Sequence, residues 1–333
     1  MTNKPTVAVI GATGYTGRFT VMELIRRGLT PIAIARDAEA LSAADFTSLG
    51  AVSRHATVDD AESLDRSIHG AQVVINCAGP FAATAHAVVA AAIRAKAHYI
   101  DVCAEQAVVE EILDLFDEPA RQANVAVVPA MAFYGGFAHL LTVAALGDWS
   151  TADSVDIMVG LDSWHPTPGS RNAINKTGNL VVTGGKLVPE TKPAQRKWRF
   201  EEPLGEQAMV GVQFSEIILI SRHIKAAEIH NYISQAALDD ILNEATPAPE
   251  AVDEMGRSAQ RFIMDAVVTR DGKQRMASAR GQDSYAASAS LSCEAAERLL
   301  QGRYTSVGAH TPGEMFDAPD FLTALDLDYS VSA

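Results

Sequence analysis

The sequence predicts an α/β fold with a doubly wound parallel sheet and an inserted second domain of the α+β class, built on a mixed or antiparallel sheet. In the N-terminal half, near-continuous apolar strands alternate with helices, which is typical of a parallel sheet covered on both faces. In the C-terminal half, strand patterns lack regular intervening helices, and the pair Asp271-Gly272 separates two of them. Asp-Gly is a strong two-residue hairpin signal, so antiparallel pairing is expected there.

In the N-terminal half, short runs rich in apolar residues predict the strands Thr6–Ile10, Pro31–Ala35, Ser53–Val58, Ala71–Asn76, Ala97–Val102 and Val125–Ala130. Apolar residues at helical spacing predict the helices Gly17–Arg27, Ala38–Leu49, Thr84–Ala95 and Gln106–Ala123. Pro119 is expected to end or kink the last of these helices. Residues 125–147 contain no Asp, Glu, Lys or Arg, but Pro129, Gly135 and Gly136 interrupt them. This interruption favours a buried strand, a turn and a buried helix over a membrane span.

In the C-terminal half, the expected strands are Ser154–Gly160, Glu216–Ile220, Ala226–Tyr232, Arg261–Arg270 and Lys273–Arg280. Residues 245–250 are a proline-rich loop, and 284–300 are an expected helix. The predicted organisation is a dinucleotide-binding domain at 1–147, a substrate or dimerisation domain at 148–283, and a segment at 284–333 that returns to the first domain.

Composition limits the partners and the compartment. The 333 residues include 27 Lys and Arg against 41 Asp and Glu, giving a formal charge of −14, which disfavours a general nucleic-acid binder. The three cysteines form no CxxC pair, and the histidines have no ligand-like spacing, so neither a disulfide framework nor a metal site is expected. We expect a cytoplasmic protein that does not enter membranes and acts on a small molecule.

A glycine-rich turn follows the first strand and opens the first helix, in the sequence Gly11-Ala12-Thr13-Gly14-Tyr15-Thr16-Gly17. Glycines in this context permit a tight turn, close approach of a diphosphate and close helix–sheet packing. The N–H groups of the first helical turn then offer an anion site. The spacing is GxxGxxG rather than GxGxxG, and a purely structural turn is the alternative.

Arg36 ends the second strand, at the position where many NAD enzymes place an acidic residue on the ribose hydroxyls. A guanidinium there favours a 2′-phosphate, and therefore NADP(H). In the alternative, Arg36 is solvated and Asp37 binds the ribose. Past the fourth strand, the small residues of Asn76-Cys77-Ala78-Gly79-Pro80 are expected to lie against the nicotinamide half. Asn76 is equally suited to capping a strand, and Cys77 to filling a small buried space.

None of the seven tyrosines has a lysine four residues later, and HExxH, GxSxG and GxxxxGK[ST] are absent. Short-chain dehydrogenase, metalloprotease, α/β-hydrolase and P-loop chemistry therefore lack their signatures. The chain resembles the saccharopine dehydrogenase-like reductase superfamily at VAVIGATGYTGR (7–18), at Ala35-Arg36, at VVINCAGPF (73–81), at HYIDVCAE (98–105) and at GAHTPGEMF (308–316).

The resemblance implies an NAD(P)-dependent reductase with a Rossmann domain, acting on C–N bonds or on C=C bonds as in the trans-acting enoyl reductases. It also implies a homodimer as the candidate assembly. After the strand-five aspartate, members often carry a small residue and then Gly-Glu, whereas here Asp101 leads into Val102-Cys103-Ala104-Glu105. That difference leaves the substrate class open.

Candidates near the nicotinamide follow from the strand ends. Tyr134, His139 or bound water is expected to donate a proton, although His139 is also suited to simple packing within its helix. Asp101 is a further catalytic candidate, or fixes its loop through backbone N–H groups. Cys103 is expected to contact the cofactor, and a role as a nucleophile is the weaker alternative.

In the second half, Tyr134 and Arg171 are expected to contact the substrate, Arg171 through a carboxylate, with a surface salt bridge as the alternative. Trp164 and Trp198 are expected in the core. The sequence therefore predicts an NADP(H)-dependent oxidoreductase that transfers a hydride to a C=N or activated C=C bond. The alternative is a non-catalytic NADP(H)-binding sensor or scaffold.

Overall fold

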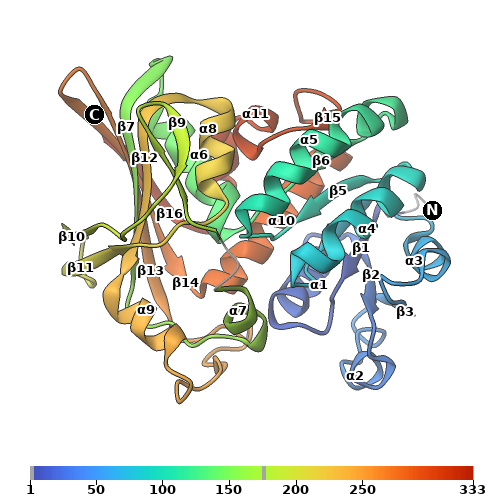
Figure 1. Ribbon diagram of the computed structural model, residues 1–333. Helices are drawn as coiled ribbons and strands as arrows, with labels where there is room; N and C mark the ends of the chain where they lie inside the picture. The colour runs from blue at the N-terminus through green and yellow to red at the C-terminus, as the bar shows by residue number, and fades with distance from the viewer. Residues whose placement is uncertain (1–3, 175–177, 333) are drawn as a thin grey trace. The chain divides into compact units, whose positions relative to one another are not determined.

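The computed structural model describes residues 4–174 and 178–332, which form two compact units (Figure 1). The first unit contains 1–103, 108–132 and 288–316, and the second contains 104–107, 133–287 and 317–333. The outer limits of the predicted domains, residues 1 and 333, lie outside the described residues.

The first unit is built on a seven-stranded sheet in the order β15-β6-β5-β4-β1-β2-β3. All of its pairings are parallel. Its strands are β1 (Thr6–Ile10), β2 (Thr30–Ala35), β3 (Val52–His55), β4 (Val73–Asn76), β5 (His98–Asp101), β6 (Ala126–Val128) and β15 (Gly308–Ala309). Its helices are α1 (Tyr15–Arg26), α2 (Ala38–Ala43), α3 (Ala61–Ile68), α4 (Phe81–Arg94), α5 (Gln106–Ala123) and α11 (Pro312–Met315), with most of α10 (Ser284–Leu300). The predicted doubly wound parallel sheet is confirmed.

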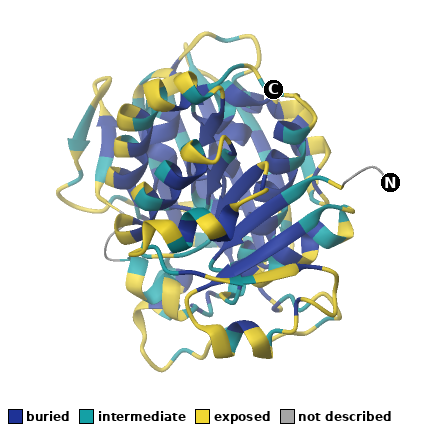
Figure 2. Cartoon of the chain, turned by 90° about the vertical axis from the view of Figure 1, so that its right-hand side faces the viewer, coloured by how far each residue is buried: buried dark blue, intermediate teal, exposed yellow. Residues whose placement is uncertain are grey.

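Apolar, β-branched sequence explains why this sheet is buried. Every residue of β4 is buried, as is all of β1 and β2 after their first residue, whereas β3 at the sheet edge is mostly exposed (Figure 2). Helix α1 packs on β1 and β2, and α4 packs on β4 and β5. This arrangement leaves the carboxyl ends of the strands as the edge where a ligand binds in such folds.

The register of the sheet aligns three of those carboxyl ends. Ile10 of β1 pairs with Asn76 of β4, and Asn76 pairs with Asp101 of β5. The turns that follow the three strands therefore lie side by side, and the end of β2 is next to them because Ile10 also pairs with Ile34.

The second unit is built on a mixed sheet in the order β10-β11-β12-β7-β13-β14-β16, to which β8 and β9 attach through β12. Its strands are β7 (Thr151–Leu161), β8 (Leu180–Thr183), β9 (Lys186–Pro189), β10 (Gln195–Arg199), β11 (Glu206–Gly211), β12 (Lys225–Ser234), β13 (Arg261–Arg270), β14 (Lys273–Gln282) and β16 (Asp328–Ser332). Its helices are η1 (Phe133–Phe137), α6 (Ala138–Leu146), α7 (Pro168–Ala173), α8 (Glu216–His223), α9 (Gln235–Leu242) and α12 (Ala318–Thr323). Strand β7 runs parallel to β12 and antiparallel to β13, so the predicted mixed sheet is confirmed.

The predicted strand at 216–220 is wrong, because these residues open helix α8. A five-residue apolar run does not distinguish a strand from a buried helix, and here the helix continues for another turn through polar residues. Pro119 lies inside α5 and does not end it.

The observed units also differ from the predicted domain limits of 147 and 284. The apolar run 125–147 is divided at 132–133, because β6 joins the parallel sheet while α6 packs against β13 and β14. The C-terminal residues 317–333 belong to the second unit, since β16 pairs with β14. No helix in the described part of the chain is long and apolar enough to cross a membrane.

Candidate functional site

The glycine-rich turn lies against two neighbouring strand ends. The N–H groups of Gly11 and Ala12 both donate to Ile34 O, at 2.9 and 3.0 Å. Gly11 has a φ of +80°, and a Cβ built on it would come within 2.9 Å of the Ala78 nitrogen. Only glycine accepts both conditions without strain, so the turn after β1 is fixed directly beside the loop after β4.

Gly14 and Gly17 differ in what surrounds them. A Cβ on Gly17 would collide with the carbonyl oxygen of Gly11. Because glycine has no Cβ, the turn can pack closely on α1. A Cβ on Gly14 would contact only Gly11 O, at 3.3 Å, and Gly14 is exposed. Gly14 is also the N-cap of α1 and contributes no capping side chain. The helix N-terminus, with Thr13, Tyr15 and Thr16 around it, is therefore open for an anion to approach.

Arg36 and Asp37 have different environments at the end of β2. The Asp37 carboxylate accepts from the N–H groups of Glu39 and Ala40, at 3.0 and 2.9 Å, and so caps α2. The Arg36 side chain is exposed and has no hydrogen-bond or ion-pair partner within the described ranges. A free guanidinium next to the glycine turn suits a phosphate, whereas the neighbouring carboxylate is already used.

Hydrogen bonds from buried side chains hold the loop after β4 in place. Asn76 is fully buried, and its Oδ1 accepts from the Ala78 N–H at 3.0 Å, while Thr84 donates to Ala78 O. Cys77 contacts the Thr20 hydroxyl through its sulfur, at 3.6 Å. Burial raises the pKa of the Cys77 thiol to about 12, so it stays protonated. Asn76 and Cys77 thus shape this edge, and Ala78, Gly79 and Pro80 form its surface.

Asp101 holds together the loops after β5 and β6. One carboxylate oxygen accepts from the N–H groups of Cys103 and Ala130, at 2.9 and 2.7 Å, and the other from the Tyr99 hydroxyl at 2.9 Å. Both Asp101 and Cys103 are completely buried. This geometry supports the loop-fixing role for Asp101; catalytic and cofactor roles for these two residues stay predictions.

Tyr134 lies in the second unit, in a backbone kink. The following residue, Gly135, has φ 138° and ψ −105°, a conformation that only glycine readily adopts. The Tyr134 ring stacks on Phe214 with centroids 4.1 Å apart and on Trp164 at 5.3 Å. Its hydroxyl is buried and has no hydrogen-bond partner among the described residues, and burial raises its pKa well above the usual value. This hydroxyl is therefore positioned but unused by the fold.

His139 and Arg171 are both engaged with the protein itself. His139 is fully buried in α6, its Nε2 lies 3.1 Å from His223 Nδ1, and burial lowers its pKa well below the usual value. Arg171 donates to three backbone carbonyls, those of Ile241, Asn243 and Thr246, at 3.1, 3.0 and 2.6 Å. Arg171 therefore stabilises the end of α9, and its predicted contact with a substrate carboxylate would have to compete with these bonds.

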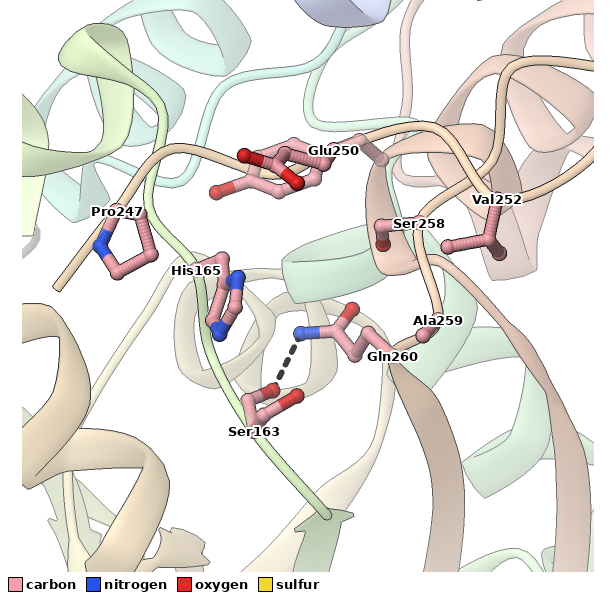
Figure 3. Close-up of a pocket in the computed structure, with 9 residues that line it drawn as sticks. Ser163, His165, Pro247, Glu250, Val252, Ser258, Ala259 and Gln260 are labelled. Atoms are coloured by element: carbon pink, nitrogen blue, oxygen red, sulfur yellow. Dashed lines mark hydrogen bonds between the residues drawn. The ribbon is translucent and has the colours of Figure 1, made fainter.

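A pocket of about 230 Å³ lies in the second unit beside Tyr285. Figure 3 shows His165 and Glu250 at its wall and the Gln260 amide donating to Ser163 O, at 2.7 Å. The Tyr285 hydroxyl accepts from Trp164 Nε1 at 3.1 Å, which links the wall of this pocket to the stacked rings around Tyr134.

Sequence reasoning missed Phe214, Glu216 and Tyr285, and it assigned Trp164 to the core alone. Trp164 is 4% exposed, so the core assignment is confirmed, but its ring also stacks on Tyr134. An acidic residue that opens the apolar run 216–220 was the available signal for Glu216. Among the described residues, no His, Cys, Asp and Glu side chains cluster as a metal site.

Comparison with known proteins finds a similarity in the first unit. Residues 7–132 match the family model described as the saccharopine dehydrogenase NADP binding domain. The N-terminal part of this chain is therefore similar to such domains. Apo saccharopine dehydrogenase (L-Glu forming) from Saccharomyces cerevisiae superposes on 99% of this chain and 100% of its own, with a TM-score of 0.69 and 14% identity. GenD2 from gentamicin A biosynthesis, in complex with NAD, covers 97% and 93%, with a TM-score of 0.50 and 15% identity. At these identities, the likeness shows the fold.

One curated relative is a lipid droplet localized protein of Caenorhabditis elegans, 28% identical over 138 residues. The match covers 37% of this chain and about a third of that relative, 32%. The residues at the carboxyl edge fit an NADP cofactor: Gly14 leaves room at the helix N-terminus, and Arg36 is a free cation beside it. These residues would hold the diphosphate and the 2′-phosphate respectively.

Proposed function

We propose that the protein is an NADP(H)-dependent oxidoreductase that reduces a C=N or an activated C=C bond of a small or medium organic substrate. The observation that carries the cofactor choice is the pair Arg36 and Asp37. Asp37 is committed to capping α2, and Arg36 is exposed beside the glycine turn without a partner in the described chain. When bound, the cofactor supplies a hydride.

The protein's own residues bind and orient the cofactor and the substrate, and they control the transfer of one proton. The first turn of α1 and Arg36 bind the phosphates, and the loop Asn76–Pro80 offers a surface of small residues for the nicotinamide half. Of the three catalytic candidates, Tyr134 has the strongest support, because its hydroxyl is buried and unpaired within the described residues. His139 and Asp101 are bonded to neighbouring protein groups. A cytoplasmic location and a homodimer stay predictions.

The test combines binding with turnover. We expect calorimetry to show NADPH binding, and absorbance to show NADPH consumption when a panel of imines, enones and keto acids is added. Binding without consumption across the whole panel would favour a sensor or scaffold. Absence of NADPH and NADH binding would contradict the proposal itself.

A further inference from the structure

Four buried side-chain atoms in the second unit lack hydrogen-bond partners among the described residues, and two of the four belong to one cluster around Phe214. These two are the Tyr134 hydroxyl oxygen and Glu216 Oε2. Each buried group left unpaired costs about 1–3 kcal/mol, and native structures rarely keep such groups without a reason. Two of them together indicate a place where a ligand completes the hydrogen bonding.

Residues 214–216 bring the two groups into the same environment. Phe214 stacks on the Tyr134 ring with centroids 4.1 Å apart, and Ser215 donates from Oγ to Tyr134 O at 3.1 Å. Glu216 follows at the start of α8, is completely buried, and its charge acts on the pKa of Tyr134. The kink at Gly135 and the stacked rings leave the Tyr134 side chain little rotational freedom.

The surroundings of Glu216 favour its neutral form. No Arg, Lys or His pairs with it in the described part of the chain, and burial raises its pKa to about 8 although the N–H groups of Phe214 and of Glu216 itself oppose this. The Phe214 N–H donates to Oε1 at 3.3 Å, so Oε1 acts as the carbonyl oxygen of the carboxyl group. The proton is then on Oε2, which becomes a donor without an acceptor.

Two neutral donors without acceptors are complementary to one oxygen with two lone pairs. We propose that the Tyr134 hydroxyl and a protonated Glu216 carboxyl together bind the carbonyl oxygen of an uncharged α,β-unsaturated carbonyl substrate. A tyrosine paired with a protonated carboxylic acid is a known way to stabilise a developing oxyanion. The proposal rests on the proposed reductase function and selects C=C over C=N reduction.

The chemistry balances with the reduced nicotinamide as the reductant. A reduced nicotinamide held by the first turn of α1 and Arg36 would supply the hydride for a new C–H bond at the β-carbon, and the C=C electron pair would move toward the carbonyl oxygen. The two donors stabilise the negative charge on that oxygen. A proton from water then completes the α-carbon, and the carbonyl is restored, so both side chains keep their protons.

The substrate is expected to be uncharged because no cation faces this cluster from the groups described. Arg171, the cation predicted for a carboxylate, is bonded to three carbonyls of its own chain. Tyr134 stacks on Phe214 and on Trp164, so aromatic rings surround this side chain, which suits an uncharged, apolar substrate.

The experiment uses 4-nitrophenol as a redox-inert probe, because its phenolate resembles the oxyanion. We expect the full-length protein to bind it without cofactor, and Tyr134→Phe and Glu216→Leu each to weaken binding by roughly tenfold or more. Glu216→Gln, which keeps an N–H donor, should retain most of the binding. Asp265→Asn is the matched control, since that buried acid already bonds Ser278 and Trp198.

Stability and cofactor binding separate the possible failures. Tyr134→Phe and Glu216→Leu should bind NADPH normally. Tyr134→Phe should not lower the free energy of unfolding in urea, because it removes an unpaired hydroxyl. Glu216→Leu also removes the Oε1 that accepts from the Phe214 N–H, so Glu216→Gln, which keeps this oxygen, is the variant for the stability comparison. Infrared spectra should show a carboxylic acid C=O band that Glu216→Gln removes. Equal probe binding in all variants, no binding by the wild type, or a destabilised Tyr134→Phe would overturn the carbonyl site. If the wild type does not bind NADPH, the reductase function is contradicted, but the probe result still tests the carbonyl site.

Discussion

Replacing Arg36 with alanine should change cofactor preference more than any other single substitution. The side chain is exposed and has no partner in the described structure, so its removal breaks no internal contact. A charge-assisted hydrogen bond contributes about 1.5–3 kcal/mol, and solvent screening at an exposed site keeps the sum of two such bonds near that range. NADPH binding should therefore weaken by roughly 10- to 150-fold, since about 1.4 kcal/mol corresponds to a tenfold change.

NADH lacks the 2′-phosphate, so its affinity should change by less than about threefold. The assay is a titration of the wild type and Arg36→Ala with each cofactor, at low and high salt, followed by nicotinamide fluorescence. The preference of the wild type for NADPH should decline with salt, while the variant should show little salt effect. Arg36→Lys should recover part of the affinity, because it keeps the charge but not the two-pronged geometry.

Arg66→Ala is the matched control, because it removes one exposed positive charge from α3, where Arg66 pairs only weakly with Glu62 at 3.5 Å. It should leave both cofactor affinities unchanged. The reasoning is refuted if Arg36→Ala weakens NADPH and NADH equally, or if Arg66→Ala reproduces its effect.

Three further substitutions test the geometry. Gly14→Ala should weaken NADPH binding with little change in Tm, whereas Gly17→Ala should lower Tm as well, because its Cβ would collide with Gly11 O; equal Tm values for the two would contradict this. Asp37→Ala should cost about 1 kcal/mol of unfolding free energy through loss of the α2 cap and leave cofactor preference unchanged; selective loss of NADH binding would instead support a ribose role. The pKa of Glu216 is raised in the fold, so its contribution to stability is greatest below its unfolded pKa near 4.5 and declines as pH rises to about 8. Urea unfolding at pH 5 and pH 8 should show that Glu216→Gln gains on the wild type as pH rises, and a constant difference would count against a buried neutral acid.

The parts of the fold that sequence predicts are those governed by local rules. The turn Asp271-Gly272 has φ values of +51° and +73°, as a two-residue hairpin turn requires, and β13 begins and ends where expected. The glycine-rich turn is also predictable from the sequence, because its conformation requires residues without a Cβ. The helix at 216–223 was missed because its apolar run satisfies both periodicities equally over so few residues.

In the candidate site, too, the sequence predicts the residues whose role depends on local position and misses those whose role depends on tertiary contacts. Arg36 is visible in the sequence because its role depends on its place after a strand. The partners of Arg171 are backbone carbonyls about 70 residues away, which leave no trace in residue types. The cluster of Tyr134 and Glu216 depends on a tertiary contact across some 80 residues and on burial that raises a carboxyl pKa, so only the folded chain reveals it.

The pairing of β7 and of β15 has a consequence for synthesis on the ribosome. Leu161 of β7 pairs with Phe262, and Ala126 of β6 pairs with Gly308. At about 5–20 residues per second, β7 leaves the ribosome roughly 5–20 s before β13 exists to cover it. The first sheet also lacks its β15 strand until residues 308 and 309 have been translated. The nascent chain therefore carries the apolar second half of β7 first without β12 and then without β13, which makes it a natural client for chaperones that bind emerging chains.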